Sequence, residues 1–378
     1  MKILHFILGK ANLDRSNGVN HVIHGLCKNI ALTENEIKVI GLSKGMKESS
    51  KLIEREKFQV IVFNKFFGEC FETLKRETVK VDIVHLHSVW NNYNILFARY
   101  LISINKPYVV TIHSGLTEDR IRQSRYWIKL LYHKFVQKYI FDKASGVHAI
   151  TREEMTGISK YTKNKNIFFV PNGIDLDNYK LQEKSYKAES EIIRFGYLGR
   201  FGIEKNIQSL ILAISQLPKI YLNKVKCTLI GPIGKEGNIL RIAVKDLKLE
   251  NHIEFTGALY GDEKQLKLKI FDFYVHPAYS DVVSIAVMEA MANGLPCVIT
   301  RTSQVSYYYK KNSFIMVEPI VQDIKRGLIE MMDKRNEWQE MSVNSISLIN
   351  SVFNWRNATK LMINEYQKIL ISNSKHKC

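Results

Sequence analysis

The chain has 378 residues, and at roughly 150 residues per domain this length predicts two domains. Apolar residues make up 46% and charged residues 24%, with 20 Gly and 7 Pro. This composition excludes a disordered, collagen-like or linker-dominated protein. The formal charge of +18 indicates attraction to phosphates or to an anionic membrane surface, and residues 1–150 carry 23 basic against 13 acidic side chains.

Neither a membrane-spanning helix nor a secretory leader is expected. No apolar run approaches the roughly 18 to 20 residues that a spanning helix needs. Residues 1–8 contain six apolar side chains, too few for a signal-peptide core. No Cys-x-x-Cys pair occurs among the five cysteines, which argues against a disulfide framework and a structural zinc site. We therefore expect a cytoplasmic protein.

The first part of the chain alternates short apolar runs with longer helical patterns. It opens with a strand over 1–8, a polar loop and an apolar-periodic helix over 19–32. A long helix is expected at about 121–141, and further strands are expected at residues 37–41, 58–63, 81–86, 108–112 and 146–150. This alternation predicts a parallel sheet with helices on both faces.

A polar stretch at 177–190 is the best candidate for a linker, and the alternation restarts after it. Strands are expected at residues 192–198, 226–230, 252–255, 271–275, 296–299 and 313–317. The remaining chain is helical in pattern and ends in a helix over 355–370. The whole pattern therefore predicts two doubly wound units in tandem. Such sheets bind ligands at the carboxyl ends of their strands, and we expect these ends of the two units to face one another across a cleft.

Residues 280–298 combine a loop, a helix and two acidic side chains. Gly294 ends this helix and the following Pro296 prevents it from resuming. Asp281 at its entrance and Glu289 inside it are about 12 Å apart at 1.5 Å per residue. That separation is too long for a glycosidase-type carboxylate pair, but it suits the two ends of one long ligand.

A phosphate could bind between these two acids. The backbone N–H groups of Val283, Ser284 and Ile285 would lie at the positive end of the helix. A nucleotide-sugar fits this layout. The alternative is an ordinary buried helix in which Asp281 or Ser284 is the N-cap and Glu289 points to solvent.

Two cations stand on the predicted loop after the strand at 192–198. Arg200 and Lys205 would lie between that strand and the next helix, where two positive charges could neutralise a diphosphate leaving group. A solvated basic loop without a ligand is the alternative.

The stretch 14–19 after the first strand places a glycine, Gly18, where backbone must pass close to a ligand or to the facing domain. This loop lacks the Gly-x-Gly-x-x-Gly dinucleotide fingerprint, and the stretch 231–235 lacks the spacing of a Walker loop. Neither stretch supports an NAD or ATP enzyme.

Histidines gather at the ends of two predicted neighbouring strands. His85 and His87 alternate on one face, and His113 stands where the next strand stops. A His-x-His pair could ligate zinc, but cysteine neighbours and an obvious third ligand are missing, so no metal is expected. We interpret His85 as structural and expect His113, which leads into a Gly-containing loop, to reach a bound ligand.

Two further patterns have competing interpretations. Asp175 and Asp177 have the Asp-x-Asp spacing of a metal-binding motif, but their place beside the presumed linker favours turn chemistry. Residues 120–143 carry seven basic side chains and one acid among several aromatic residues. This segment is either an interfacial helix on anionic lipid or a helix packed on the sheet with its basic side chains outward. In a combined interpretation it packs into the core and keeps its outer stripe near lipid.

Four motifs in this order resemble the retaining glycosyltransferases of family 4, which have the GT-B fold. They are Thr111-Ile-His113 after a Gly-containing first loop, Pro171-Asn-Gly-Ile-Asp175, Gly199-Arg-x4-Lys-Asn206 and Asp281-x7-Glu289. The resemblance covers nearly the whole chain. It implies an α/β protein of two Rossmann-like doubly wound domains, with a nucleotide-sugar bound mainly by the second and no metal or other cofactor required.

The resemblance also implies domain boundaries and roles in the second domain. Residues 1–180 would form the acceptor-side domain and 191–354 the donor-binding domain, with a helix over 355–378 crossing back to the first. Glu289 would bind the ribose hydroxyls and Asp281 the hydroxyls of the donor sugar. The diphosphate would be held by Arg200 and Lys205.

In the first domain the resemblance implies that Gly18 lets the first loop approach the diphosphate and that His113 lies beside the reacting anomeric carbon. The chain also departs from the family pattern. The first acid is usually Glu and here is the shorter Asp281, residues 282–284 replace Gly-Phe-Gly-like residues, and the first loop has one glycine where two are common.

We therefore expect a retaining hexosyltransferase that extends a lipid-linked or lipopolysaccharide-type glycan from a UDP- or GDP-sugar. Neutralisation of the departing diphosphate favours front-face attack by an acceptor hydroxyl without a covalent enzyme intermediate. The basic first domain would contact the anionic inner face of the membrane. The alternatives are a nucleotide-sugar epimerase on the same fold and a non-catalytic nucleic-acid-binding protein, although no nucleic-acid recognition motif is present.

Overall fold

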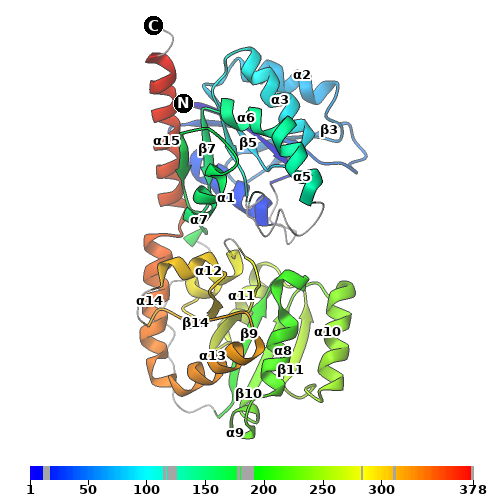
Figure 1. Ribbon diagram of the computed structural model, residues 1–378, viewed down its shortest axis with the longest axis vertical. Helices are drawn as coiled ribbons and strands as arrows, with labels where there is room; N and C mark the ends of the chain where they lie inside the picture. The colour runs from blue at the N-terminus through cyan, green and yellow to red at the C-terminus, as the bar shows by residue number, and fades with distance from the viewer. Residues whose placement is uncertain are drawn as a thin grey trace. The chain divides into compact units, whose positions relative to one another are not determined.

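The computed structural model describes residues 1–11, 18–113, 116, 126–176, 179, 191–281, 284–309 and 312–375. The chain divides into two compact units, one of Met1–Gly173 with Trp355–Cys378 and the other of Ile174–Asn354. Each unit is a mainly parallel sheet flanked by helices (Figure 1). The predicted linker at 177–190 lies, apart from Tyr179, outside the described residues.

The first unit is built on an eight-stranded sheet of order β3-β4-β2-β1-β5-β6-β7-β8. Its strands are β1 (Lys2–Leu8), β2 (Glu36–Leu42), β3 (Ser50–Glu54), β4 (Gln59–Phe63), β5 (Ile83–His87), β6 (Tyr108–Thr111), β7 (Gly146–Ala149) and β8 (Ile167–Phe169). Only β3 pairs antiparallel, with β4, among these strands. The order reverses between β1 and β5, which is the switch point of a doubly wound sheet.

The sequence predicts every strand of this sheet except β3 and β8. The edge strand β3 is mostly exposed and β8 has three residues, so neither gives a clear apolar run. The helices are α1 (Gly18–Ala31), α2 (Glu69–Thr78), α3 (Asn92–Ser103), α5 (Tyr126–Tyr132), α6 (Lys138–Lys143), α7 (Arg152–Ser159) and α15 (Trp355–Lys375), with a π-helical segment His133–Gln137 between α5 and α6.

The second unit holds a six-stranded sheet of order β11-β10-β9-β12-β13-β14. The strands are β9 (Ile193–Leu198), β10 (Val225–Ile230), β11 (Ile253–Gly257), β12 (Phe273–His276), β13 (Cys297–Thr300) and β14 (Ile315–Val317). All their pairings are parallel. Numbered along this unit the order is 3-2-1-4-5-6, the Rossmann order, and it reverses between β9 and β12.

The helices of the second unit either connect consecutive strands, as parallel pairing requires, or, in the case of the last two, follow β14. They are α8 (Ile207–Ser215), α9 (Lys219–Leu222), α10 (Gly234–Asp246), α11 (Gly261–Lys269), α12 (Ile285–Ala292), α13 (Val321–Asp333) and α14 (Trp338–Ser351), with short 3₁₀ segments at Ile203–Lys205, Gln304–Tyr308 and Arg335–Glu337.

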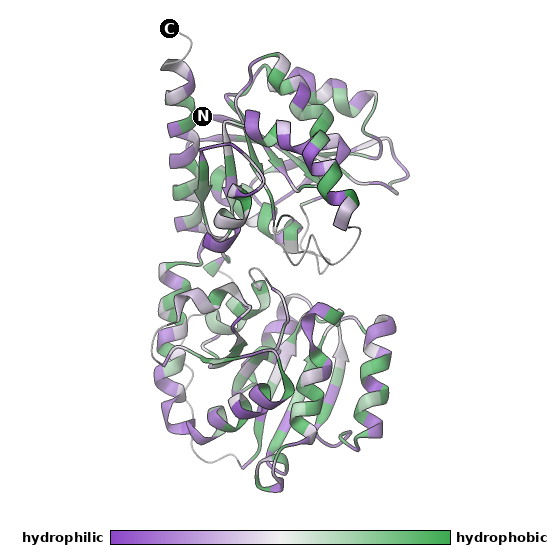
Figure 2. Ribbon diagram, viewed as in Figure 1, coloured by the Kyte–Doolittle hydropathy of each residue, from purple (hydrophilic) through white to green (hydrophobic). Residues whose placement is uncertain are grey.

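Both faces of each sheet are buried. In β12, Phe273 and Val275 belong to one apolar cluster, while Tyr274 between them belongs to the cluster on the other face. Figure 2 shows this as hydrophobic strands inside helices that mix both kinds of residue. Parallel strands covered on both faces have continuous apolar sequences, and for this reason most of the strands could be predicted from the sequence.

The terminal helix α15 belongs to the first unit, and two close contacts fix it there (Figure 1). Gly25 on α1 leaves room for the Trp355 indole, because a Cβ at this position would stand 2.0 Å from the indole Nε1. The Tyr366 hydroxyl lies 2.5 Å from Nδ1 of His85 on β5. Both side chains of the latter pair are buried, so this helix is tied to the centre of the sheet.

The Tyr366 contact continues across the sheet as a chain of hydrogen bonds. Nε2 of His148 lies 2.9 Å from the Val170 carbonyl, so this nitrogen carries the hydrogen and Nδ1 accepts from the Thr111 hydroxyl at 2.7 Å. Thr111 has then used its hydrogen and accepts from Nε2 of His85 at 2.5 Å. His85 must therefore accept from Tyr366, and every group in the chain has one assignment.

Acidification should destabilise the protein through its buried histidines. Burial lowers the pKa of His5 to about 3 and that of His148 to about 4, and holds the pKa values of His85 and His87 well below the usual range, against roughly 6.5 in an unfolded chain. Because the unfolded state binds more protons below that value, this stability is fully present above pH 6.5 and is lost as the pH falls toward about 4.

Each imidazole that stays neutral should cost about 1.4 kcal/mol of unfolding free energy per pH unit in that window. Urea titrations followed by circular dichroism at about pH 7, 6 and 5 should show the steepest loss below pH 6. The variant His148→Gln should lose part of this pH dependence. A free energy of unfolding that stays constant from about pH 7 to 5 would contradict the assignment of neutral buried rings.

Candidate functional site

The predicted site residues of the second unit gather at the carboxyl edge of its sheet, where the strand order reverses. Arg200 and Lys205 lie in the loop after β9, and Asp281 lies in the loop after β12. These two strands are neighbours in the sheet. Crevices at such reversals are where doubly wound folds bind ligands.

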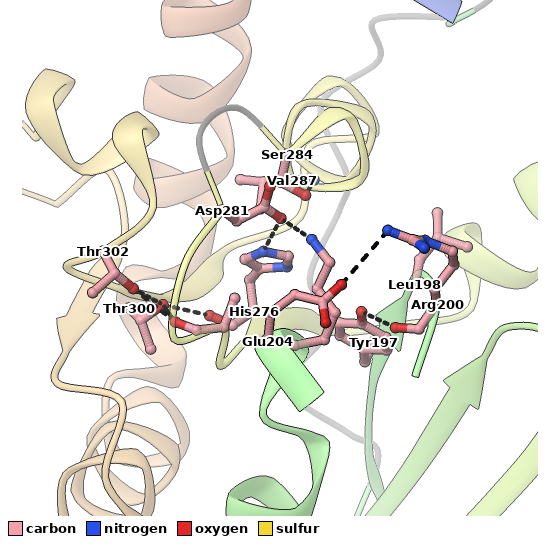
Figure 3. Close-up of polar contacts among 12 residues, drawn as sticks. Tyr197, Leu198, Arg200, Glu204, His276, Asp281, Ser284, Val287, Thr300 and Thr302 are labelled. Carbon is pink, nitrogen blue, oxygen red and sulfur yellow. Dashed lines mark hydrogen bonds and ion pairs between the residues drawn. The ribbon is translucent and has the colours of Figure 1, made fainter. Parts of the chain in front are cut away.

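Lys205, Asp281 and His276 form one contact group, and Figure 3 shows Asp281 and His276 facing one another. Oδ2 of Asp281 lies 2.6 Å from Nζ of Lys205 and 2.7 Å from Nε2 of His276. Burial alone would raise the pKa of Asp281, but the hydrogen bond from His276 and the charge of Lys205 outweigh it and hold this pKa well below its usual range. The carboxylate is therefore ionised and balanced by the lysine.

His276 is a site residue that sequence reasoning missed. Burial lowers its pKa, so the ring is neutral and donates from Nε2 to Asp281. It is the last residue of β12, five positions before Asp281. A histidine at the carboxyl end of a buried strand next to a predicted site acid was the available signal.

The loop after β9 is locked to the loop after β12. Asn206 has a left-handed φ of 57°, and its amide donates to the carbonyls of Pro277 at 2.9 Å and Pro319 at 3.1 Å. The Thr302 hydroxyl donates to the Ala278 carbonyl at 2.7 Å, and Asp281 forms a parallel bridge with Ser303. These bonds hold Lys205 against Asp281.

Arg200 lies beside this group with a more accessible side chain. Its guanidinium is 3.5 Å from a carboxylate oxygen of Glu204, and the side chain is 58% exposed. The backbone at this point is fixed, because the buried Tyr197 hydroxyl donates to the Arg200 carbonyl at 2.9 Å. Figure 3 shows Arg200 and Glu204 approaching one another above Tyr197. Both predicted cations therefore stand on this loop, one paired inward and one facing solvent.

Helix α12 starts with a side-chain cap. The Ser284 hydroxyl accepts a hydrogen bond from the Val287 N–H at 3.3 Å, so Ser284 is the N-cap and Asp281 is not. The backbone N–H groups of Ile285 and Ala286 lie in the first turn, where the helix offers them no carbonyl partner. Val283, the other residue predicted to bind a phosphate here, lies outside the described residues.

Glu289 is buried, so the alternative in which it points to solvent is wrong. Its exposed fraction is 6%, and its Oε1 lies 2.7 Å from Nζ of Lys264 on α11. The Tyr179 hydroxyl also donates to Glu289, and burial followed by the charge of Glu289 raises the pKa of this phenol well above 10. Lys264 and Tyr179 are partners that the sequence pattern did not reveal, because they come from other elements.

The first unit places its predicted residues at the carboxyl ends of β1, β5 and β6. Gly18 is the first residue of α1, and the loop before it, residues 12–17, lies outside the described residues. His113 follows β6 with a left-handed φ of 51°, a conformation that costs energy for a residue other than glycine. Its Nε2 lies 3.1 Å from Nδ1 of His87.

Two predictions about metal residues have different outcomes. His85 is structural, as expected, since both its ring nitrogens are bonded to Tyr366 and Thr111. The Asp-x-Asp pattern is only half described, because Asp177 lies outside the described residues while Asp175 follows the short bridge at Ile174. The turn interpretation of Asp175 stays a prediction.

Comparison with known proteins identifies the family. The model described as Glycosyltransferase Family 4 matches residues 16–178, and that described as Glycosyl transferases group 1 matches residues 178–347. An uncharacterized glycosyltransferase of Methanocaldococcus jannaschii is 24% identical over 82% of this chain and 79% of that protein. The Escherichia coli UDP-Gal:alpha-D-GlcNAc-diphosphoundecaprenol alpha-1,3-galactosyltransferase is 25% identical over 61% of this chain and 60% of its own length.

A solved structure extends the likeness to the fold. HepE from Anabaena, determined with UDP, superposes with a TM-score of 0.76 at 14% identity, covering 97% of this chain and 100% of that one. The likeness agrees with the two doubly wound sheets described above. The chain therefore belongs to glycosyltransferase family 4 and has the GT-B fold.

Proposed function

We propose that this enzyme is a retaining hexosyltransferase. Its donor is a UDP- or GDP-sugar, and its acceptor is a hydroxyl of a glycan or lipid-linked glycan in bacterial surface polysaccharide or lipopolysaccharide synthesis. The E. coli relative, by its name, transfers galactose from UDP-Gal to a diphosphoundecaprenol-linked sugar. HepE has been solved with UDP and with UDP-glucose. Both support a uridine nucleotide as the first donor to test.

The observation that carries the proposal is the set of charges at the β9–β12 reversal. Lys205, which pairs with Asp281 in the loop before α12, and Arg200, which stands on the same loop as Lys205, supply positive charge, and the N–H groups of the first turn of α12 suit a phosphate. Asp281 precedes α12 and Glu289 lies within it, and both carboxylates can accept hydrogen bonds from hydroxyls. In this proposal Glu289 binds the ribose, Asp281 the donor sugar, and the two cations the diphosphate.

The reaction needs no metal in this proposal. Arg200 and Lys205 take the part that a divalent cation plays elsewhere, since they neutralise the charge that develops on the departing diphosphate. The acceptor oxygen bonds to the anomeric carbon on the face where the bond to the diphosphate oxygen breaks, the hydroxyl proton passes to the departing diphosphate, and no covalent enzyme intermediate forms. The family resemblance assigns His113 to this carbon and Gly18 to the approach of the first loop.

Nucleotide binding tests the site directly. Wild type with EDTA and saturating UDP or GDP should show a thermal shift of about 5 to 10 °C with one nucleotide, as expected near 100 times Kd. Glu289→Ala should lose this shift because the ribose loses its acceptor.

The matched control is Glu254→Ala, since Glu254 also pairs with a lysine of α11, Lys267, but plays no part in the proposed site. It should keep the full shift. Equal shifts in wild type and the Glu289 variant would contradict the assignment. A nucleotide shift that requires manganese would contradict the metal-free mechanism.

Lys205 should matter for turnover in addition to folding, so its variants are compared at equal folded fraction. In Lys205→Ala the diphosphate loses a preorganised charge, and kcat should fall by about 10²- to 10³-fold. Lys205→Arg should recover part of the rate because it keeps the charge. The control Lys219→Ala removes a lysine of α9, which precedes β10 at the opposite edge of the sheet. If both alanine variants kept the wild-type kcat, Lys205 would have no part in leaving-group stabilisation.

The proposal includes peripheral contact of the first unit with an anionic membrane, at its cytoplasmic face. Four large apolar side chains recur every four residues along α5, the π-helical segment and α6, and all are exposed: Trp127, Leu131, Phe135 and Tyr139. Helix α5 has no fully buried residue, but its Tyr126, Leu130 and Tyr132 are partly buried against the core, so this helix packs on the unit with one side and exposes the apolar stripe on the other. A four-residue spacing overshoots a 3.6-residue turn, and the wider π turn corrects part of that drift.

Charge supports the same surface. Lys129, Lys134 and Lys143 flank these apolar side chains, in the mixture that favours the interface of anionic lipid. Among the residues the structure describes, no helix has the length and hydropathy to cross a bilayer. Membrane contact in this proposal is therefore a surface contact.

Vesicle binding tests this surface. Wild type should sediment with phosphatidylglycerol-containing vesicles at low salt and less at high salt. Phe135→Ser should weaken binding by about tenfold, because it removes a large ring that would be buried in the lipid of the bound state. Phe67→Ser is the matched control, since Phe67 is 70% and Phe135 71% exposed but Phe67 lies apart from α5. Equal effects of the two substitutions would contradict a defined membrane surface.

A further inference from the structure

A second chain of histidines runs beside the one that ends at Tyr366. Nδ1 of His5 lies 2.8 Å from Nε2 of His87, and Nδ1 of His87 lies 3.1 Å from Nε2 of His113. The rings are stacked, with centroids 5.1 Å and 5.4 Å apart. The chain leads from the interior of β1, through the end of β5, to the residue that follows β6.

All three rings are neutral near pH 7. Burial lowers the pKa of His5 and of His113 to about 3 and holds that of His87 well below its usual range. A neutral imidazole has one N–H and one bare nitrogen. In a linear chain of such rings, the position of one hydrogen therefore determines all the others.

His5, at the inner end of this chain of rings, determines in which direction its hydrogen bonds are donated. Nε2 of His5 is buried and has no hydrogen-bond partner among the described residues. An orphaned N–H is rarer and more costly in a protein interior than an orphaned acceptor, so the hydrogen of His5 belongs on Nδ1, which donates to His87. His87 then donates from Nδ1 to His113, and the hydrogen of His113 is on its own Nδ1.

We infer that His5 and His87 are positioning residues that fix His113 as the Nδ1–H tautomer. This rests on the proposed function, in which His113 lies beside the donor sugar. With Nε2 occupied by His87, any hydrogen bond from this ring to substrate comes from Nδ1, and in this tautomer it is a donation to an oxygen. His113 binds a sugar hydroxyl or ring oxygen as a donor and does not act as a base toward the acceptor hydroxyl.

The backbone agrees with a ring held in one orientation. His113 pays for a left-handed φ of 51°, and such strain persists only where the surroundings determine the conformation. A zinc site is the competing explanation, because ligand nitrogens of His5, His85 and His87 lie within 4.8 Å of one another. However, the rings of His85 and His87 are stacked at 4.2 Å with 22° between their planes, so their nitrogens do not converge, and both nitrogens of His85 are bonded to oxygens.

The tautomer can be measured on the full chain without activity. Long-range ¹H–¹⁵N correlation spectra of ¹⁵N-histidine protein should show His113 with a protonated Nδ1 and a bare Nε2. His87→Leu removes the hydrogen bond from Nδ1 of His87 to Nε2 of His113, and the His113 signals should become those of a mixture of the two tautomers. His87→Asn should restore the wild-type signals, because its short amide can donate from the position of Nδ1.

Kinetics give the second readout. His87→Leu should lower kcat by about tenfold, the worth of one hydrogen bond, and leave the UDP or GDP thermal shift unchanged, because that shift reports the second unit. His87→Asn should recover most of the rate. The matched control is His85→Leu, which removes an equally buried ring two residues away on β5 that has no bond to His113, and it should keep kcat in its folded fraction.

Three results would overturn the inference. The first is wild-type His113 protonated on Nε2. The second is an unchanged His113 signal in His87→Leu. The third is stoichiometric zinc that purifies with the wild type and is lost in His5→Asn. If wild type and variants alike failed to bind any nucleotide, the proposed function would fail while the spectra still decided the tautomer.

Discussion

The second unit depends on one contact, the ion pair between Lys205 and Asp281 across the point where the strand order reverses. Without the other, the loop after β9 would enclose the charge of Lys205 and the loop after β12 that of Asp281 with no partner. Removing one partner of a buried ion pair lowers the free energy of unfolding by about 3 to 5 kcal/mol. Asn206 and His276 hold the two sides so that the pair forms. The same geometry would bring a diphosphate and its sugar to one place, since the loop after β9 carries the cations and the loop after β12 carries the acid.

Compensated charge also explains how carboxylates can serve a neutral sugar. A hydroxyl brings a hydrogen-bond donor but no charge, so a buried Asp or Glu that relied on it alone would remain uncompensated. Here Lys205 balances Asp281, and Lys264 balances Glu289. In the proposed function, sugar and ribose hydroxyls therefore add to carboxylates that already have a lysine partner. Arg200 is the more accessible cation, and its guanidinium can contact the phosphate directly.

The sequence located most of the fold and the core of the site, for a physical reason. Strands buried on both faces are continuous apolar runs, and residues just after such runs must lie at one edge of the sheet. Arg200, Lys205 and Asp281 could therefore be grouped from the sequence.

Partners that come from other elements could not be predicted in this way. Lys264 reaches Glu289 from α11, and its place depends on how two helices pack, which no local pattern encodes; the solvent-facing alternative for Glu289 failed for that reason. The aromatic side chains of α5 left more than one interpretation open, because apolar character alone does not say which of them are covered: Tyr126 and Tyr132 pack against the core, whereas Trp127 is exposed.

The first unit shows how two residues on one strand can have different tasks. His85 and His87 share a face of β5 and their rings stack, yet their hydrogen bonds lead to different ends. The chain through His85 is closed at both ends, by the Val170 carbonyl and by the Tyr366 hydroxyl, and it joins α15 to the sheet. The chain through His87 begins in the interior at His5, whose Nε2 has no partner among the described residues, and its outer end is a strained residue at the carboxyl edge of the sheet. Burying neutral histidines costs stability in acid, and an apolar side chain would avoid that cost. An imidazole, however, can accept a hydrogen bond on one side and donate one on the other, which passes a fixed polarity from the interior to the edge and which no apolar side chain can do.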